Sequence, residues 1–511
     1  MSGSLPALQD HAAAAAEAFC RRYVQPPKRR RRRAGTHAQS DITHAIRSRP
    51  KPGKFYRPRD HEASPFFKVV RDYFDEFERV YPERYQKRYG YWRPVIRSSI
   101  DKLLKCGDLK EGFARVRCPD CKAEFFVAFS CRQRGCCPSC GQKRALLLAH
   151  RLNGEVLADV PHRQWVFAIP KRLRVYFRYD RSLLGKLCHA AWETVRDVYA
   201  LEVDSDSGVP AMIGAVQSFG SLINWNSHVH AVIPEGVFTE SGQFVHIPDI
   251  FKNRAEEFWQ ERVFALLLDE HKINDDIAGS MRGWKHSGFS VDNSVRIERG
   301  DKAGMQRLVE YVSRCPFSLS RMVSLTKDGD ASKSPTGDKI LYRASHANCL
   351  PFPISGDKTL MAGIPRNFEV FEPLDFLAEV TQHIPDKGDH QFHYFGWYSN
   401  KKRGMQLKKM PKAQQATGMN EPDTPYRRKA RMTWAALIKA VYELDPLKCP
   451  NCGGTMRIVS FIEKHQSEVV EKILRHCGLW REAAPRPPPK AVEDKFEEPV
   501  LDYGFFDRVC I

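Results

Sequence analysis

Asn226-Ser227-His228-Val229-His230-Ala231-Val232-Ile233 has the pattern of a β-strand that carries two histidines at positions i and i+2. Because side chains alternate between the two faces of a strand, His228 and His230 are expected on one face and the apolar residues that follow each of them on the other. Two imidazoles side by side on a rigid strand can supply half of a metal site. The alternative is an ordinary pair of strand histidines, because this motif is short and frequent, but three further features of the chain favour the metal site.

The composition is that of a globular protein with an excess of positive charge. The 511 residues are enough for about three or four domains. No apolar run approaches the roughly 18 residues of a membrane span, and the alanine-rich residues 12–16 lack the features of a signal peptide. A net charge of +20 and a pI near 9.3 favour a polyanionic partner, most simply nucleic acid, although a basic protein without such a partner is the alternative. We therefore expect a cytoplasmic, nucleoid-associated protein.

Closely spaced cysteine pairs indicate a zinc site. The chain has 15 cysteines and no secretion signal, which is typical of reduced, metal-binding thiols rather than of a disulfide scaffold. Fifteen residues separate the pair Cys118 and Cys121 from the pair Cys137 and Cys140, so these four thiolates are expected to surround one structural Zn²⁺. The ligand set stays open because of three extra thiols, which are Cys106, Cys131 and Cys136.

Another Cys-x-x-Cys pair, Cys449 and Cys452, lies near the C-terminus within the sequence Cys-Pro-Asn-Cys-Gly-Gly. This half-site is expected to hold a second zinc ion. The candidates for its remaining ligands are His476 and Cys477 on a later helix.

A short helix with a tyrosine between two arginines follows the histidine strand. Residues 304–315 are predicted to form this helix, which Pro316 ends. Tyr311 has Arg307 at i−4 and Arg314 at i+3, so both arginines are its neighbours on the helix surface. Cations in these positions would favour a phenolate and bind a phosphate. The alternative is an amphipathic tyrosine beside surface arginines.

The densest positive region after the N-terminal tail lies between residues 401 and 431, directly after Tyr394, Trp397 and Tyr398. Aromatic rings beside basic side chains are typical of surfaces that contact the phosphates and bases of a nucleic acid strand. A solvated linker is the alternative. The candidate DNA-contacting side chains in this region are Lys401, Lys402, Arg403, Arg427 and Arg428.

We predict an α+β fold with a central antiparallel sheet and flanking helices, a preceding zinc ribbon and a small C-terminal zinc-knuckle region. Helical and strand-like segments alternate without a glycine-rich phosphate loop, and hairpin-like neighbours favour antiparallel pairing. The expected organisation is a disordered basic tail (1–62), a helical segment with a zinc-binding domain (63–157), a catalytic domain (158–350), a basic DNA-contacting region with the C-terminal knuckle (351–480) and a disordered tail (481–511).

The order of these features resembles that of rolling-circle insertion-sequence transposases with an HUH (His-hydrophobe-His) single-strand endonuclease domain and an N-terminal zinc-binding domain. The matching segments are residues 118–144, 216–238, 288–322 and 445–462. Val229 fits the hydrophobic middle position of the histidine motif. The combination of four motifs in one order is far more specific than any one of them.

The resemblance implies breakage and rejoining of single-stranded DNA through a 5′-phosphotyrosine. Tyr311 would be the nucleophile, and His228 and His230 would hold Mg²⁺ or Mn²⁺. Some members of the family have two tyrosines four residues apart, but Arg307 stands at the second position here, so the chain resembles the one-tyrosine branch. Two candidates for a third metal ligand remain open, Gln217 and Asp292.

Two other functions fit part of the pattern. A non-catalytic zinc-ribbon protein that binds nucleic acid, such as a degenerate transposase, needs the basic surface and the knuckles but not Tyr311 or the histidine pair. A replication initiator would use the same nicking chemistry. The intact tyrosine and histidine pair favour a transposase that moves an insertion sequence by rolling-circle transposition.

Overall fold

The computed structural model describes residues 62–201, 208–247, 252–325, 339–344, 368–409 and 448–480. Nearly all of the two predicted tails, residues 1–62 and 481–511, lies outside these ranges, as do Arg427 and Arg428. None of the helices in the described ranges is both long enough and apolar enough to cross a membrane.

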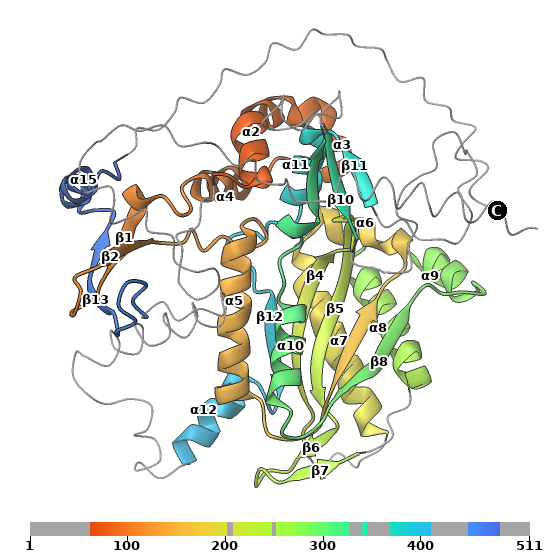
Figure 1. The fold of residues 1–511 in the computed structure, drawn as a ribbon. Helices are drawn as coiled ribbons and strands as arrows, with labels where there is room; N and C mark the ends of the chain where they lie inside the picture. Colours follow the sequence, from red (N-terminus) through yellow and green to blue (C-terminus); the bar gives the residue numbers. More distant parts are fainter. Residues whose placement is uncertain are drawn as a thin grey trace, which may run out of the picture.

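A five-stranded antiparallel sheet forms the centre of the molecule, with the strand order β12-β4-β5-β3-β8 (Figure 1). The histidine strand β5 is the middle strand, so both of its edges are paired. This sheet confirms the predicted α+β fold. Its strands are β3 (His162–Ala168), β4 (Ala211–Phe219), β5 (Trp225–Pro234), β8 (Ser290–Ile297) and β12 (Phe392–Gly396).

One face of the sheet packs against α7 (Ser182–Ala200) and α8 (Lys252–Asp269), which lie behind it in Figure 1. Alternation along β5 sends Val229 and Ile233 to this side, where they share a buried cluster with Trp259 of α8. The apolar residues of the histidine motif therefore anchor β5 in the larger core, as predicted.

The opposite face of the sheet is covered by α5 (Pro138–Arg151) and α10 (Lys302–Val312) (Figure 1). Val232, which alternation places on the same face as the two histidines, is buried here with Leu308 and Val309 of α10. The histidines therefore face the tyrosine helix across this second core.

A second unit contains the N-terminal helices and a small sheet of order β11-β10-β9. The rings of Phe66, Phe317 and Phe376 meet in its core, with centroids 4.5 to 6.4 Å apart. Its elements are α2 (Pro65–Arg84), α3 (Gln86–Tyr89), α4 (Pro94–Leu104), α11 (Pro373–Thr381), β9 (Met322–Leu325), β10 (Lys339–Arg343) and β11 (Phe368–Phe371).

The cysteine ribbon is a three-stranded antiparallel sheet of order β13-β1-β2. The central strand β1 (Gly112–Arg117) pairs with β2 (Glu124–Ala128) on one edge and with β13 (Arg457–Glu463) on the other. The helix α15 (Ser467–His476) covers one face, where Leu474 shares a buried cluster with Phe113 of β1. The predicted N-terminal ribbon and C-terminal knuckle are thus both present and form one sheet.

The remaining elements are short connections around these units. The π-helix η2 continues α5, and β6 and β7 pair as a hairpin beyond the end of β5. These elements are α6 (Lys171–Tyr179), α9 (Asp275–Arg282), α12 (Asn400–Lys409), β6 (Gly236–Phe238), β7 (Phe244–His246), η1 (Leu109–Glu111), η2 (Leu152–Val156) and η3 (Leu319–Arg321).

Candidate active site

The histidine pair is buried at the middle of the sheet. His228 is 8% exposed and His230 is 3% exposed, and their Nε2 atoms lie 3.1 Å apart. Neighbouring ligands around an octahedral ion with bonds of about 2.1 Å are about 3 Å apart. The separation of the two nitrogens therefore fits ligation of one divalent ion.

The Nδ1 atoms of both histidines have fixed partners. His228 Nδ1 lies 2.8 Å from the carbonyl oxygen of Asn226, which can only accept, so this nitrogen donates and leaves the Nε2 lone pair free. His230 Nδ1 lies 2.8 Å from the side-chain amide of Gln164 on β3. Burial lowers the pKa of His228 to about 4 and that of His230 to about 2. Both rings are therefore neutral near pH 7, the form that binds metals.

Gln217 carries an unpaired buried oxygen beside the histidines. It lies opposite His228 in the pairing of β4 with β5, so both side chains point to the same face. Its Nε2 donates to the carbonyl oxygen of Val312 at 2.7 Å, and its Oε1 has no hydrogen-bond partner among the described residues. A buried orphan acceptor at this position fits a cation, because an unpaired buried oxygen is otherwise costly.

Asp292, the other predicted candidate for the third ligand, lies further from the histidines. It is exposed on β8, which β3 separates from β5. Its carboxylate accepts hydrogen bonds from the backbone N–H and the hydroxyl of Ser294, both at 3.2 Å. Of the two candidates, Gln217 is the one beside the histidine pair.

The tyrosine helix brings Tyr311 to the histidines. Asp301 caps the N-terminus of α10, where its side chain accepts a hydrogen bond from the backbone N–H of Gly304 at 2.7 Å, and the helix ends at Val312. The ring of Tyr311 stands nearly perpendicular to that of His230, with centroids 5.6 Å apart. Tyr311 is 45% exposed, so a strand of DNA can reach it.

Only one of the two predicted arginines touches this tyrosine. The guanidinium carbon of Arg314 lies 4.5 Å from the centroid of the Tyr311 ring and 5.5 Å from that of Phe219. Burial lowers the pKa of Arg314, and its Nε has no partner among the described residues. Arg307 is exposed one turn earlier and is not among the described groups that contact Tyr311. Arg314 is therefore the cation positioned at the site.

Sequence reasoning missed a further cation, Arg174 on α6. Its Nε donates to the carbonyl oxygen of Ile169 at 3.1 Å, one residue beyond Ala168, which pairs with His228 across β3 and β5. After burial, the positive charges of Arg174 and Arg314 also lower the pKa of His228. The basic run that follows β3 was visible in the sequence, but spacing alone did not reveal which arginine turns towards the histidines.

Within the described ranges the cysteines form two clusters, each with four thiols, and the predicted grouping of Cys118, Cys121, Cys137 and Cys140 around one zinc is wrong. The first cluster lies at the start of α5, where three pairs of its sulfur atoms lie 3.5 to 3.8 Å apart. Hydrogen bonds from its other three thiols lower the pKa of Cys140, which favours the thiolate that binds zinc. The members of this first cluster are Cys106, Cys131, Cys137 and Cys140.

The second cluster joins the two ends of the ribbon. Cys118 Sγ lies 3.6 Å from Cys452 Sγ, and Cys121 Sγ lies 3.4 Å from Cys449 Sγ. The expectation that His476 or Cys477 completes the C-terminal half-site is therefore wrong, because its partner is the pair Cys118 and Cys121. Cys136 is buried outside both clusters.

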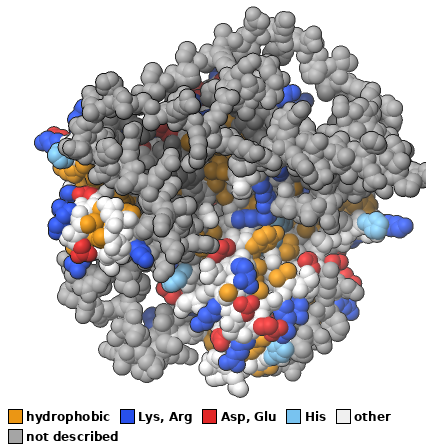
Figure 2. All heavy atoms as spheres, viewed as in Figure 1, with side chains coloured by type: hydrophobic (Ala, Val, Ile, Leu, Met, Phe, Trp, Pro, Cys, Tyr) orange, Lys and Arg blue, Asp and Glu red, His pale blue; other side chains and the backbone are white. Residues whose placement is uncertain are grey.

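The predicted basic region is represented by α12, which directly follows β12 at the edge of the central sheet. Lys402 Nζ lies 5.7 Å from the centroid of the Trp397 ring, and the guanidinium carbon of Arg403 lies 5.4 Å from that of Tyr394. Lys401 is exposed on the same helix. In the view of Figure 2, positive side chains of the described residues are mixed with acidic and apolar ones.

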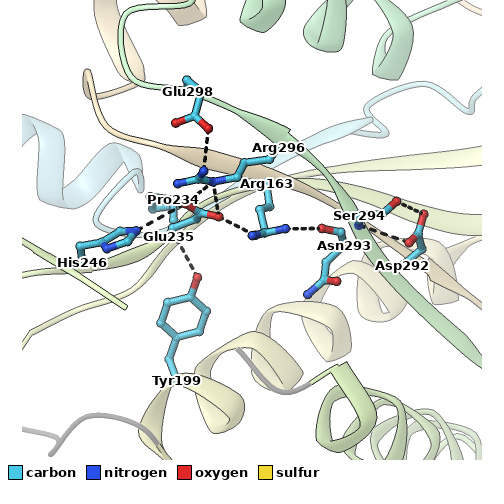
Figure 3. A network of polar contacts seen from close by, with 10 residues as sticks. All are labelled: Arg163, Tyr199, Pro234, Glu235, His246, Asp292, Asn293, Ser294, Arg296 and Glu298. Carbon is cyan, nitrogen blue, oxygen red and sulfur yellow. Dashed lines mark hydrogen bonds and ion pairs between the residues drawn. The ribbon is translucent and has the colours of Figure 1, made fainter. Parts of the chain in front are cut away.

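A polar network holds the end of β5 that lies away from the histidines (Figure 3). The carboxylate of Glu235, which is 2% exposed, is bound by Arg163 at 2.5 Å, by Arg296 at 2.8 Å and by His246 at 3.4 Å. Burial alone would raise the pKa of Glu235, but Arg296 and the other cations hold it below its usual range. Tyr199 OH donates to the carbonyl oxygen of Pro234 at 2.7 Å. These contacts tie β3, β5 and β8 together, which is a structural task.

Comparison with known proteins gives three results. A family model described as "Transposase zinc-binding domain" matches residues 76–169, and one described as "Putative transposase" matches residues 211–405. The "Transposase for insertion sequence element IS801" of Pseudomonas savastanoi pv. phaseolicola is 25% identical over 384 residues, which cover 72% of this chain and 84% of that protein. No solved structure matches the chain. The first model includes the whole first cysteine cluster, and the second includes the histidines and Tyr311, whereas Cys449 and Cys452 lie beyond both.

Proposed function

Because the chain belongs to the family of rolling-circle insertion-sequence transposases that carry a zinc-binding domain, we propose that it cuts and rejoins single-stranded DNA through Tyr311. The observation that carries this proposal is the meeting of Tyr311, His230 and Arg314 within one small volume. A protein that only bound DNA would need none of these contacts. The proposed outcome is movement of an insertion sequence by rolling-circle transposition.

In the proposed reaction, Tyr311 Oη attacks a backbone phosphorus as the bond from that phosphorus to the 3′ oxygen breaks. The phenol loses its proton and the departing 3′ oxygen takes one up, so the products are a 5′-phosphotyrosine and a free 3′-hydroxyl. A 3′-hydroxyl can later attack the phosphotyrosine and release the tyrosine. The covalent intermediate conserves the phosphodiester energy, so joining needs no nucleotide triphosphate.

His228, His230 and Gln217 are the proposed ligands of a catalytic Mg²⁺ or Mn²⁺. A bound divalent ion would offset negative charge on the phosphate in the transition state. The geometry of this chain supports the assignment through the 3.1 Å separation of the Nε2 atoms and the unpaired Oε1 of Gln217. Gln164 would orient the ring of His230 by accepting the Nδ1 proton through its amide oxygen, for which its side-chain amide would turn over so that the oxygen faces Nδ1.

Arg314 and Arg174 are the proposed phosphate-binding cations. Both guanidiniums lie near the histidine pair, and Arg314 has an unused donor at Nε. A guanidinium that is partly withdrawn from water binds a phosphate more strongly than one in bulk solvent. Because Arg307 stands one turn before Tyr311, where a second tyrosine would lie in other family members, each chain would supply one nucleophile.

The zinc-binding clusters have a proposed structural role. Four thiolates complete the tetrahedral shell of zinc and leave no position for a substrate. The positive side chains of α12, together with Arg427 and Arg428 outside the described residues, are proposed to contact the phosphates of the strand.

A covalent-adduct assay tests the proposed nucleophile. Purified protein would be mixed with labelled single-stranded DNA from the element's own ends and Mg²⁺ or Mn²⁺, and the products separated on a denaturing gel. We expect a metal-dependent shifted band that is lost in Tyr311→Phe and in His228→Ala. Tyr91→Phe is the matched control, because Tyr91 is 81% exposed and distant in sequence from the site. If the wild type binds this DNA but forms no adduct, the chain is a binding protein instead.

The proposed third ligand has its own test. Gln217→Ala should weaken activation by Mn²⁺ by about tenfold or more, as removal of groups that support a metal does elsewhere. Asp292→Ala should leave the metal dependence unchanged because its carboxylate is bound to Ser294. The reverse ranking of these two variants would overturn the assignment of Gln217. A replication initiator would give the same results, and only transposition of a marked element in cells separates the two functions.

A further inference from the structure

A cavity of about 490 Å³ opens beside the tyrosine helix. It lies between the first turn of α5, the turn that joins β4 to β5, and the segment that follows α10. Its volume is within the range of small-molecule sites, about 300–1,000 Å³. Its lining includes Ser139, Gln142, Phe219, Arg314, Ser318 and Tyr342.

The cavity adjoins the proposed active site. Arg314 lines it and also lies over the ring of Tyr311, so one guanidinium touches both places. Glu310, the residue before Tyr311, lines it as well. A strand whose phosphate lies at Tyr311 would therefore have its neighbouring nucleotide at the mouth of this cavity.

The walls combine apolar surface with hydrogen-bonding groups. Phe219, Phe317 and Tyr342 are buried and supply rigid aromatic surface. The hydroxyl of Tyr342 accepts a hydrogen bond from the backbone N–H of Ser318 at 3.1 Å, which fixes that side of the cavity. Gln142 is exposed at the opposite side, with its amide free to donate and accept. Such a lining suits a flat, polar-edged ring better than a phosphate alone.

The zinc-binding region builds one wall of the cavity. Ser139 lies between Cys137 and Cys140, two members of the first cysteine cluster. A Cβ atom at Gly141 would lie 3.1 Å from the Cβ of Cys315, so the first turn of α5 packs tightly against the segment after the tyrosine helix. The cavity is therefore held in shape from both sides.

We propose that this cavity receives one unpaired base of the DNA strand, from the nucleotide next to the phosphate at Tyr311, and that Gln142 and Ser318 contact its edge. The inference rests on the proposed strand cleavage and adds a point at which the chain distinguishes the DNA sequence at the cut. Bases in such single-strand sites contribute affinity through apolar contact and edge hydrogen bonds.

The test measures binding without cleavage. Fluorescein-labelled single-stranded DNA from the element's ends would be titrated with the full chain carrying Tyr311→Phe, and one nucleotide at a time would be replaced by an abasic residue. We expect one position next to the cleavage site at which the abasic residue weakens binding by about tenfold. When Gln142→Ala or Ser318→Ala is added, the loss of affinity caused by the abasic residue should become several-fold smaller. The side chain that would contact the base is then already absent.

The matched control is Gln243→Ala, since Gln243 is exposed in the β6–β7 hairpin and does not line the cavity. An abasic effect that persists in full in both Gln142→Ala and Ser318→Ala would overturn the proposal, as would equal affinities for all abasic strands. Because this measurement needs no nicking, the wild type could fail the adduct assay and still show the abasic effect. That result would reject strand cleavage by Tyr311 but would still support the binding of a base in this cavity.

Discussion

The two cysteine clusters contain the same ligands but close very different lengths of chain. In the first, Cys106 and Cys140 are 34 residues apart, whereas in the second Cys118 and Cys452 are 334 residues apart. The first lies at the start of α5, which packs on the tyrosine helix. The second joins the turn between β1 and β2 to the segment before β13. The first cluster therefore supports the proposed active site, whereas the second ties distant segments of the chain together.

The largest expected effect is that of Cys140→Ser in the first cluster. We expect zinc content to fall from about two ions per chain to about one. Adduct formation should fall by roughly a hundredfold, because the loss of a structural zinc removes folding free energy from the start of α5. Elemental analysis and the covalent-adduct assay measure the two effects. Cys477→Ser, outside both clusters, is the control, and an adduct yield at the wild-type level in Cys140→Ser would show that the first site does not support the active site.

Removal of zinc by a chelator should distinguish the clusters by rate. Cys137 and Cys140 are buried, while Cys121 and Cys452 are exposed. We expect the second site to release its zinc roughly tenfold faster, because less of the structure must open first. A colorimetric chelator would then report two phases, and the fast phase should vanish in Cys452→Ser. If the fast phase vanishes in Cys140→Ser instead, the first cluster is the one that releases its zinc faster.

Cys452→Ser should leave the chemistry nearly intact. We expect adduct formation to stay within about threefold of the wild type, since the second cluster has no member on α5 or α10. The C-terminal knuckle should become more sensitive to limited proteolysis, and mass spectrometry would identify new cuts within residues 448–463. A large loss of adduct together with normal protease resistance would contradict this division of roles.

The smallest expected effects come from the glycine beside each cluster. Gly141→Ala would place a Cβ 3.1 Å from the Cβ of Cys315 and should cost about 1–2 kcal/mol of unfolding free energy. Gly454→Ala would place one against the carboxylate of Asp120, an exposed side chain that can turn aside at the cost of its weak contact with the Cys118 thiol. Thermal unfolding should therefore show the larger decrease in Tm for Gly141→Ala. Equal decreases would mean that the ribbon is packed as tightly as α5.

The sequence predicted what depends on local pattern. Alternation placed the histidines on one face of β5, and helical spacing placed Arg314 beside Tyr311. The prediction of which cysteines share a zinc ion was wrong. Each Cys-x-x-Cys pair directs two sulfurs to one point, but the sequence does not specify which two pairs meet in space. The sequence identified Gln217 and Asp292 as candidates for the third metal ligand. Only the strand order shows that Gln217 is the one beside the histidines.

Other features had no sequence signal. Arg174 was one of several cations in a basic run, and it is distinguished by its bond to Ile169 and by its charge, which helps to lower the pKa of His228. The cavity proposed to receive a base is assembled from segments near residues 139, 219, 314 and 342, which no window of sequence contains together.

The pairing of β1 with β13 has a consequence for synthesis of the protein. The ribosome makes β1 and β2 more than three hundred residues before β13, so the first cluster can fold early while one edge of β1 stays open. An open edge of a strand invites pairing with other chains. Shortened products of translation that stop before residue 448 would therefore aggregate through β1, and only a chain completed through β13 closes that edge.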